Sequence, residues 1–295
     1  MFDLGELQGT MRLAVDRGRD LTAWTLKVGD GSRLHGRQTP EQHRGKTPVV
    51  LLHGFCGKSA QMLGIARAVG AQQRALIYDA RGHGESSEFV DEPTMRQLAD
   101  DLAAVIDFAA ADKVDIVGLS MGAQTVFEYL RHYGTKRIRR LVFVDQGPKL
   151  LAEAGWDHAL FGGMEEAEVA DFLKALRHRP RTLGRAWLRG LWRSREHVAI
   201  KIALTPQLLA GLPGTKATTL RLGADMLRHD WRPVVQKIDV PVLLCYGGHS
   251  MYPDAGRWMA ANVPGSQLEW FANSGHGLMF QEPVRVARVV KGFLG

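Results

Sequence analysis

The stretch Gly118-Leu119-Ser120-Met121-Gly122 places a serine between two glycines, directly after the apolar run of residues 114–117. Such a run is typical of a buried strand, and helical spacing begins at Met121. Glycine weakens both strands and helices, so a pair of glycines around Ser120 indicates that a special backbone shape is needed there. A sharp strand-to-helix bend lifts a serine hydroxyl clear of the sheet, at a cost of about 1–3 kcal/mol in strain. An ordinary turn is the alternative, and the rest of the chain has to decide between them.

The chain around this stretch alternates short apolar runs with amphipathic segments. Strands are predicted at residues 49–52, 75–78, 114–117, 141–144, 240–246 and 268–271, and helices at 59–69, 94–111, 121–133, 254–262 and 283–293. Continuous apolar runs indicate parallel strands covered on both faces, so we expect an α/β fold with a mostly parallel twisted sheet flanked by helices. Residues 11–28 predict a hairpin that turns at 16–20, and residues 29–48 predict a loop. Between 148 and 231 the pattern is helical and arginine-rich, which predicts an insertion into the sheet domain.

Composition excludes several classes of protein. The chain has 295 residues, 45% of them hydrophobic, and no apolar run near the ~20 residues that span a bilayer. Its two cysteines do not form a disulfide framework and its first residues lack a secretion signal, so we expect a cytoplasmic protein. The net charge is +7, with 14 Lys and Arg against 9 Asp and Glu between residues 149 and 232. No zinc-ligand cluster or RNA-binding aromatic pattern accompanies this charge, and we expect no nucleic-acid partner.

Two further loops supply partners for Ser120. Residues 53–57, His-Gly-Phe-Cys-Gly, follow the first parallel strand, and this turn can aim the amide of Phe55 at the space above Ser120. Together with the amide of Met121 it would form an oxyanion hole. Residues 273–277, Asn-Ser-Gly-His-Gly, place His276 after the last strand, where a general base for Ser120 should stand. We expect His53 to orient its turn and not to act as the base. A loop histidine that is merely solvated is the alternative for His276.

Four motifs in this order resemble the α/β-hydrolase superfamily: His53-Gly54-Phe55, the Asp-Ala-Arg-Gly-His-Gly of residues 79–84, the Ser120 stretch, and Ser274-Gly275-His276. The resemblance covers residues 48–147 and 232–294. It implies an eight-stranded sheet with Ser120 as the nucleophile, His276 as the base, and the amides of Phe55 and Met121 as the oxyanion hole. It also implies a core of residues 1–147 and 232–295 with a helical cap at 148–231. The Ser-Met-Gly elbow further resembles the arylesterase and cofactor-free haloperoxidase branch.

The acid of the triad departs from the pattern of this superfamily. Its members usually carry an aspartate shortly after the strand that follows the cap, where this chain has Ser250. A serine cannot carry the charge that stabilises an imidazolium. We favour Asp145, which ends the strand at 141–144, over Asp254, whose position suits a helix N-cap. Two alternatives stay open: that Asp145 only holds the following turn, and that no acid is present.

The tryptophans and arginines of the predicted insertion suggest the kind of substrate that is bound. In this architecture such a cap usually covers the catalytic face, so Trp156 and Trp231 are candidates for an apolar substrate pocket. The alternative, which we favour for most tryptophans of the insertion, is that they form the core of the cap itself. Residues 177–196 hold seven arginines and one acid, which suggests a basic rim for anionic substrates such as acyl-CoA or an acidic carrier protein. A solvated helix face is the alternative interpretation of these arginines.

These expectations together imply a serine hydrolase, an enzyme that uses a serine side chain as the nucleophile in hydrolysis. The substrate would be a small to medium apolar ester, lactone or thioester, cleaved through an acyl-enzyme and without a metal or organic cofactor. Fold alone does not settle the chemistry. Two alternatives use the same residues: a C–C bond hydrolase acting on a ketone, and a small-molecule-binding protein whose triad has decayed, which the serine at position 250 would explain.

Overall fold

The computed structural model describes residues 20–40, 46–178, 217–252 and 254–295, and these residues form an eight-stranded sheet. The strands lie in the order β1-β2-β4-β3-β5-β6-β7-β8. β1 and β2 are antiparallel to each other and β2 is antiparallel to β4, whereas every pair from β4 to β8 is parallel. The bounds are β1 Thr22–Lys27, β2 Arg33–Gln38, β3 Val49–Leu52, β4 Ala75–Tyr78, β5 Val114–Leu119, β6 Ile138–Val144, β7 Val242–His249 and β8 Gln267–Gly275. The expected mostly parallel α/β sheet is therefore confirmed.

The N-terminal hairpin differs from its prediction. It joins β1 to β2 through a turn at residues 28–32, in which the Ser32 amide donates a 2.9 Å hydrogen bond to the Asp30 side chain and the Val28 amide donates one to the Ser32 carbonyl. The loop predicted at 29–48 was wrong where β2 runs, and residues 11–19 lie outside the described part of the chain. β2 escaped prediction because Leu34 is its single buried apolar side chain. The other buried position is Gly36, where a Cβ atom would stand 2.1 Å from the Trp24 ring.

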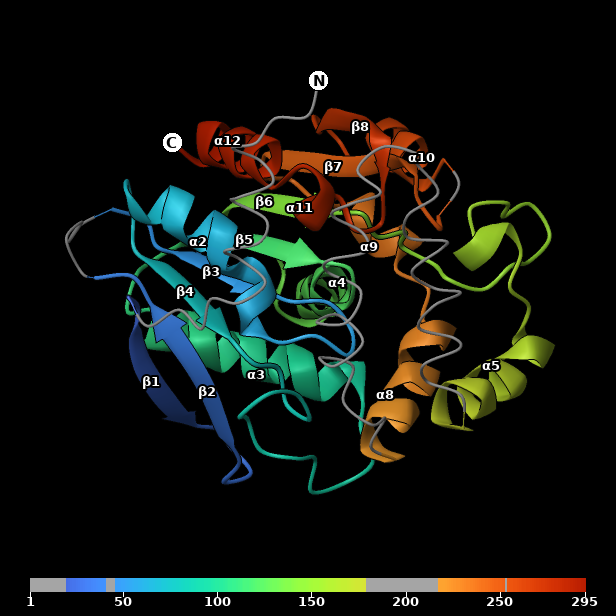
Figure 1. The fold of residues 1–295 in the computed structure, drawn as a ribbon, viewed down its shortest axis with the longest axis horizontal. Helices are drawn as coiled ribbons and strands as arrows, with labels where there is room; N and C mark the ends of the chain where they lie inside the picture. Colours follow the sequence, from blue (N-terminus) through green and yellow to red (C-terminus); the bar gives the residue numbers. More distant parts are fainter. Residues whose placement is uncertain (1–19, 41–45, 179–216, 253) are drawn as a thin grey trace.

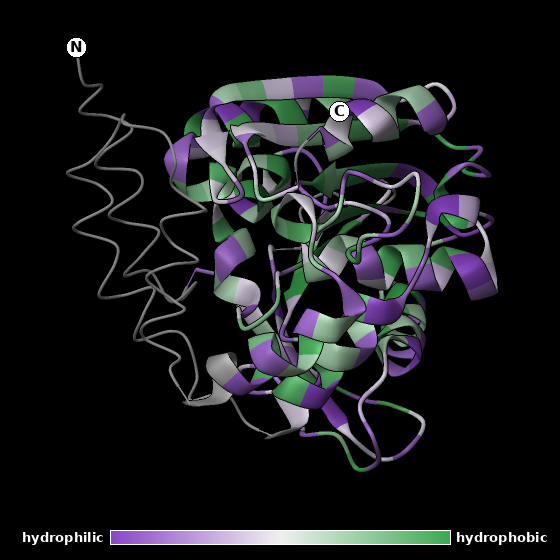
Figure 2. Cartoon of the chain, turned by 90° about the vertical axis from the view of Figure 1, so that its right-hand side faces the viewer, coloured by the Kyte–Doolittle hydropathy of each residue, from purple (hydrophilic) through white to green (hydrophobic). Residues whose placement is uncertain are grey.

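Helices cover both faces of the sheet (Figure 1). The core on one face is shared with α3 Met95–Phe108, α4 Met121–Tyr133, α9 Arg232–Val235 and α10 Ala255–Asn262; the core on the other is shared with α2 Leu63–Gly70, α11 Leu278–Gln281 and α12 Pro283–Leu294. α3 begins with a capping box, in which the Thr94 hydroxyl accepts the Gln97 amide and the Gln97 side chain accepts the Thr94 amide. The helices carry both hydrophilic and hydrophobic residues along their length, as amphipathic helices on a sheet do (Figure 2).

Two further helices follow β6 in the chain. α5 Glu166–His178 and α8 Ala217–Arg228 pack against each other, beyond the end of the central strands to which the β5 arrow points (Figure 1). A short 3-10 turn at Leu160–Gly162 precedes α5, and another at Ser59–Met62 precedes α2. Trp187, Trp192 and most of the arginine-rich stretch lie outside the described residues. Within the described ranges no helix combines the length and apolar character that crossing a bilayer requires.

Candidate active site

Ser120 sits in the bend between β5 and α4 with backbone angles φ 51° and ψ −118°. A positive φ is strained for a residue with a side chain, and this strain is what the sequence predicted for the serine between its glycines. The Ser120 amide still completes the sheet, donating a 3.0 Å hydrogen bond to the carbonyl of Val144. The side chain therefore leaves the sheet at a fixed point, at the N-terminus of a helix.

The two flanking glycines allow this bend because backbone packs directly against them. A Cβ atom at Gly118 would lie 2.7 Å from the backbone of Ala123 in α4, and one at Gly122 would lie 2.6 Å from the carbonyl oxygen of Leu52 in β3. Real Cβ contacts are essentially never this short. The glycines let the first turn of α4 approach both strands, and this close approach is why a pair of them surrounds Ser120.

His276 follows β8 and reaches Ser120 from the next loop. Its Nε2 atom lies 3.0 Å from Ser120 Oγ, and the two side chains are 7% and 8% exposed. The loop is fixed on both sides: the Ser274 hydroxyl donates a 2.6 Å hydrogen bond to Glu282, and the Gly275 amide donates a 2.8 Å hydrogen bond to Gln281. Serine and imidazole thus stand within hydrogen-bonding distance, as a nucleophile and its base must.

Asp145 completes a chain of three side chains. Its Oδ2 atom lies 2.7 Å from Nδ1 of His276, and its side chain is fully buried. The residue directly follows β6 and has a φ of 50°, so a second strained bend turns this carboxylate over the sheet edge. When Nδ1–H donates to the carboxylate, Nε2 carries the lone pair that can accept the proton of the Ser120 hydroxyl.

Asp254, the alternative acid, lies elsewhere. Its carboxylate forms an ion pair with Arg257 one helical turn away, its side chain is 56% exposed, and it has no hydrogen bond to His276 among the described contacts. Nor does its side chain cap α10, the helix that it precedes. The structure brings Ser120, His276 and Asp145 together and leaves Asp254 on the surface.

Ser250 received no role from sequence reasoning, but the structure places it beside the acid. Its hydroxyl donates a 2.6 Å hydrogen bond to Asp145 Oδ2, the same oxygen that faces His276. The amide of Gly247 donates a 2.9 Å hydrogen bond to Asp145 Oδ1. The signal available in the sequence was position alone, since polar residues after a parallel strand gather at one edge of the sheet.

Tyr252 was also missed. Its hydroxyl donates a 3.1 Å hydrogen bond to Gln146 Oε1. The ring meets the His276 ring edge-on at 5.5 Å between centroids. Burial, followed by the negative charge of Asp145, raises the pKa of Tyr252, so the phenol stays protonated at neutral pH.

The turn at residues 53–57 lies against Ser120. A Cβ atom at Gly54 would stand 3.3 Å from the Cβ of Ser120, and the Gly54 amide donates a 3.1 Å hydrogen bond to Gln61 Oε1. The amides of Phe55 and Met121 donate no hydrogen bond to any residue that the structure describes. A developing oxyanion requires donors of this kind.

Two neutral histidines hold this turn. His53 Nε2 accepts the Ala80 amide at 2.9 Å, so its Nδ1–H donates to the Gly54 carbonyl at 2.8 Å. His83 Nε2 accepts the Cys56 amide at 3.3 Å. Burial lowers the pKa of His53, which favours the neutral ring that these hydrogen bonds need.

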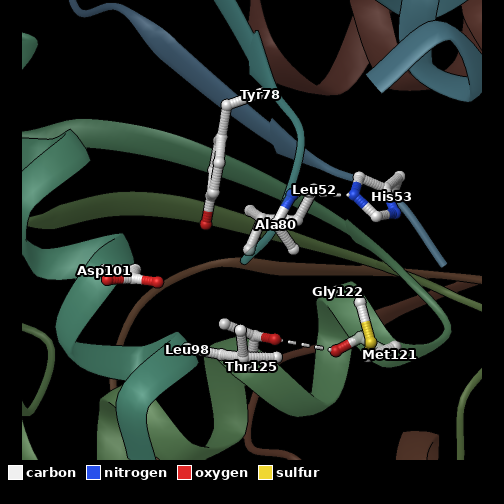
Figure 3. A pocket seen from close by; sticks show the side chains of 9 residues that line it. All are labelled: Leu52, His53, Tyr78, Ala80, Leu98, Asp101, Met121, Gly122 and Thr125. Carbon is white, nitrogen blue, oxygen red and sulfur yellow. Dashed lines mark hydrogen bonds between the residues drawn. The ribbon is translucent and has the colours of Figure 1, made fainter. Parts of the chain in front are cut away.

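A small cavity of about 10 Å³ lies behind the turn (Figure 3). A volume of this size holds roughly one water molecule. The cavity is lined by Leu52, His53, Tyr78, Ala80, Leu98, Asp101, Met121, Gly122 and Thr125. The Thr125 hydroxyl donates a 3.0 Å hydrogen bond to the Met121 carbonyl at its edge. Ser120 and His276 are not among the lining residues, so this space is not the substrate pocket.

The two tryptophans predicted as pocket residues belong to the packed interior. Trp231 is fully buried and its indole N–H donates a 2.7 Å hydrogen bond to Glu128, while Trp156, 2% exposed, packs edge-on against Trp258. Their placement favours the alternative interpretation, that they form the core at the base of the insertion. In the described part of the chain no group of three or more His, Cys, Asp or Glu side chains is arranged to hold a metal ion.

Known proteins share this architecture. Among curated proteins, the pimeloyl-[acyl-carrier protein] methyl ester esterase of Nitrosomonas europaea is 27% identical over 239 residues, which are 80% of this chain and 90% of that protein. Among solved structures, an esterase from Exiguobacterium antarcticum (TM-score 0.79, 19% identity) and a bromoperoxidase from Bacillus anthracis (TM-score 0.80, 21% identity) each cover 92% of this chain, and are themselves covered to 98% and 99%. The sequence profile of the alpha/beta hydrolase fold matches residues 47–283. The chain belongs to the α/β-hydrolase fold family.

Proposed function

We propose that the protein is a serine hydrolase that cleaves carboxylic esters, lactones or thioesters of small to medium apolar acyl groups through an acyl-enzyme. One observation carries the proposal: the His276 imidazole lies between Ser120 Oγ at 3.0 Å and Asp145 Oδ2 at 2.7 Å. This arrangement lets a neutral imidazole take the serine proton while the carboxylate stabilises the imidazolium that forms. The curated relative named as a methyl ester esterase supports hydrolysis of an ester.

The reaction runs in two halves. Ser120 Oγ attacks the acyl carbon and passes its proton to His276 Nε2, and the carbonyl oxygen becomes an oxyanion between the amides of Phe55 and Met121. Collapse of this intermediate breaks the bond to the leaving group, which takes the proton from His276. A water molecule then attacks the acyl-enzyme, gives a proton to His276, and releases the acid as Ser120 recovers its proton. Asp145 accepts the Nδ1–H hydrogen bond of His276 in both halves.

We assign residues 148–231 to a cap over this site and the rest of the chain to the catalytic core. α5 and α8 support this division, since the Phe55 ring lies beneath α8: a Cβ atom at Gly223 would stand 3.1 Å from it and 3.5 Å from Leu173 of α5. The side chain of an oxyanion-hole residue therefore contacts the insertion itself. The proposal includes anionic substrates, in which the acyl group is attached to coenzyme A or to an acidic carrier protein. The name of the curated relative, an esterase of an acyl-carrier protein ester, supports the second of these.

The experiment is a substrate panel with one variant. Wild-type protein and Ser120→Ala are compared on p-nitrophenyl esters from acetate to dodecanoate, on simple lactones, and on acyl-CoA. We expect the wild type to hydrolyse part of the panel and Ser120→Ala to lose at least about a thousandfold of that rate. Hydrolysis that survives in folded Ser120→Ala refutes the proposal. Turnover of a vinylogous 1,5-diketone with none of any ester would instead assign the site to C–C bond hydrolysis, and an inert wild type would leave a binding function.

A further inference from the structure

Ser250 has no role in the proposed mechanism, although it touches the carboxylate on which that mechanism depends. We infer that Ser250 is a positioning residue for the Asp145–His276 pair, whose hydroxyl holds the carboxylate in place and lowers the negative charge that it presents to the imidazole. The inference rests on the proposed function, because it assigns Ser250 a part in tuning the base of that reaction. It also replaces the hypothesis that a serine at position 250 marks a decayed triad.

The hydrogen bonds of Asp145 show how the carboxylate is held. Its Oδ1 atom accepts the Gly247 amide at 2.9 Å, and its Oδ2 atom accepts both the Ser250 hydroxyl at 2.6 Å and the Nδ1–H of His276 at 2.7 Å. No part of the side chain reaches solvent. A buried carboxylate that accepts three hydrogen bonds has little freedom to rotate, so His276 meets one orientation of it.

Ser250 is itself fixed as a donor. Its Oγ atom accepts the Tyr252 amide at 3.0 Å, and its own amide donates a 3.2 Å hydrogen bond to the Gly247 carbonyl. With the incoming N–H on one lone pair, the hydroxyl proton is directed at Asp145. The short segment 247–252 therefore presents one donor to each carboxylate oxygen of the acid.

The consequence for His276 has a definite sign. A donor on Oδ2 stabilises the carboxylate and draws charge from the oxygen that would stabilise an imidazolium, so the neutral imidazole is favoured. Loss of the Ser250 hydroxyl should therefore make His276 hold its proton to higher pH. The Gly247 amide still holds the carboxylate in the absence of that hydroxyl, so we expect the change in charge to outweigh any movement of Asp145. If Ser250 were only a loop residue, its loss would leave the titration of His276 in place.

The titratable groups in contact with His276 identify the carboxylate through which Ser250 acts. Asp145 hydrogen-bonds to the His276 ring, Tyr252 packs edge-on against it, and Glu282 binds the neighbouring Ser274. Tyr252 stays protonated over the range of interest, since burial raises its pKa. A change at Ser250 therefore reaches the imidazole through Asp145.

The test follows the titration of His276 directly. Wild type, Ser250→Ala and the hydroxyl-keeping control Ser250→Thr are labelled with ¹⁵N-histidine, and their imidazole signals are recorded from pH 4.5 to 9. The chain has 11 histidines, so the His276 signal is assigned as the one that His276→Gln lacks. We expect the midpoint to rise by about 0.5–1 pH unit in Ser250→Ala and to stay at the wild-type value in Ser250→Thr. A midpoint that is unchanged or lower in folded Ser250→Ala overturns the inference, and so does a Ser250→Thr midpoint that moves as far as that of Ser250→Ala.

A kinetic arm separates this inference from the proposed function. The acidic limb of the kcat/KM profile on a p-nitrophenyl ester should move upward with the NMR midpoint in Ser250→Ala, and its plateau should fall about threefold to tenfold as the carboxylate loses one restraint. If the wild type hydrolyses nothing, the proposed function fails while the NMR titration still gives its answer. If hydrolysis is present and the limb does not move, the inference about Ser250 fails alone.

Discussion

The Asp145 carboxylate at the end of β6 reaches across β7 to meet His276 at the end of β8, with 2.7 Å between Oδ2 and Nδ1. β7 lies between the two strands and contributes the Gly247 amide to the same carboxylate at 2.9 Å. The carboxylate and the imidazole thus come from the ends of strands that are not neighbours, and the strand between them donates a backbone hydrogen bond to the carboxylate.

This relationship predicts the effect of removing the charge. Asp145→Asn should lower kcat/KM by about 10⁴, because an amide at this position can favour the wrong tautomer of His276 and cannot stabilise the imidazolium. Asp254→Asn makes the same chemical change at the exposed carboxylate that pairs with Arg257, and should keep nearly full activity. Steady-state kinetics on an activated ester compare the two. Near-full activity in Asp145→Asn would remove this residue from the mechanism.

The glycine pair around Ser120 predicts a loss of stability when a methyl group is added. Gly122→Ala would place a Cβ atom 2.6 Å from the Leu52 carbonyl oxygen, and such overpacking costs about 1–3 kcal/mol. Gly292→Ala in α12 is the matched control, since Gly292 is also a helical glycine and nothing lies within 4 Å of its added Cβ atom. Both substitutions reduce the freedom of the unfolded chain equally. In urea unfolding we expect Gly122→Ala alone to be destabilised; equal stability of the two variants would show that the close approach at Gly122 carries no cost.

The features that a few consecutive residues mark could be predicted from the sequence. The bend at Ser120 and the loop of His276 each combine an apolar strand with flanking glycines, and both appear where the pattern placed them. The parallel strands were readable because their apolar runs are continuous. β2 was not, because one of its two buried positions is a glycine covered by the Trp24 ring, and a glycine carries no hydropathic signal.

Contacts between distant segments could not be predicted in the same way. The sequence favoured Asp145 over Asp254 by position alone, because Asp145 directly follows a predicted strand and Asp254 stands where a helix N-cap is expected. The bend with φ 50° at Asp145 and its burial beside β7 arise from tertiary packing. The same holds for Ser250, whose hydrogen bond to Asp145 joins residues 105 positions apart.

His53 predicts a pH dependence of stability. Burial lowers the pKa of His53 below its ordinary value of 6.5, so the folded protein binds this proton less readily than the unfolded chain. The contribution of the neutral His53 to the free energy of unfolding is fully present above about pH 6.5. It is lost as the pH falls below that value, and the free energy of unfolding then falls by at most ~1.4 kcal/mol per pH unit. Protonation would turn Nε2 from the acceptor of the Ala80 amide into a donor.

The measurement is the free energy of unfolding between pH 5 and 8 in wild type and in His53→Gln. The variant cannot titrate at this position, so its stability, although lower at neutral pH, should fall less steeply below pH 6.5. Identical slopes in the two proteins would mean that His53 does not couple to folding.

The hydrogen bond between Gln61 and the turn at residues 53–57 predicts that Gln61 affects kcat. Its Oε1 atom accepts the Gly54 amide next to the proposed oxyanion donor Phe55, so Gln61→Leu should loosen the turn. We expect kcat to fall about tenfold with little change in KM, less than the 10²–10³ lost with a whole oxyanion donor. Lys58→Ala, an exposed change in the same loop, is the control. If kcat falls in both variants, or in neither, Gln61 does not support the oxyanion hole.

Covalent labelling of Ser120 tests most directly whether this serine is an activated nucleophile. Folded wild-type protein is treated with a fluorophosphonate, its intact mass is recorded, and the modified peptide is sequenced by mass spectrometry. We predict one adduct per chain on Ser120, formed rapidly by wild type, slowly by His276→Gln, and absent in Ser120→Ala. A wild-type protein that stays unmodified, or an adduct that forms on another residue of Ser120→Ala at the wild-type rate, would contradict the assignment.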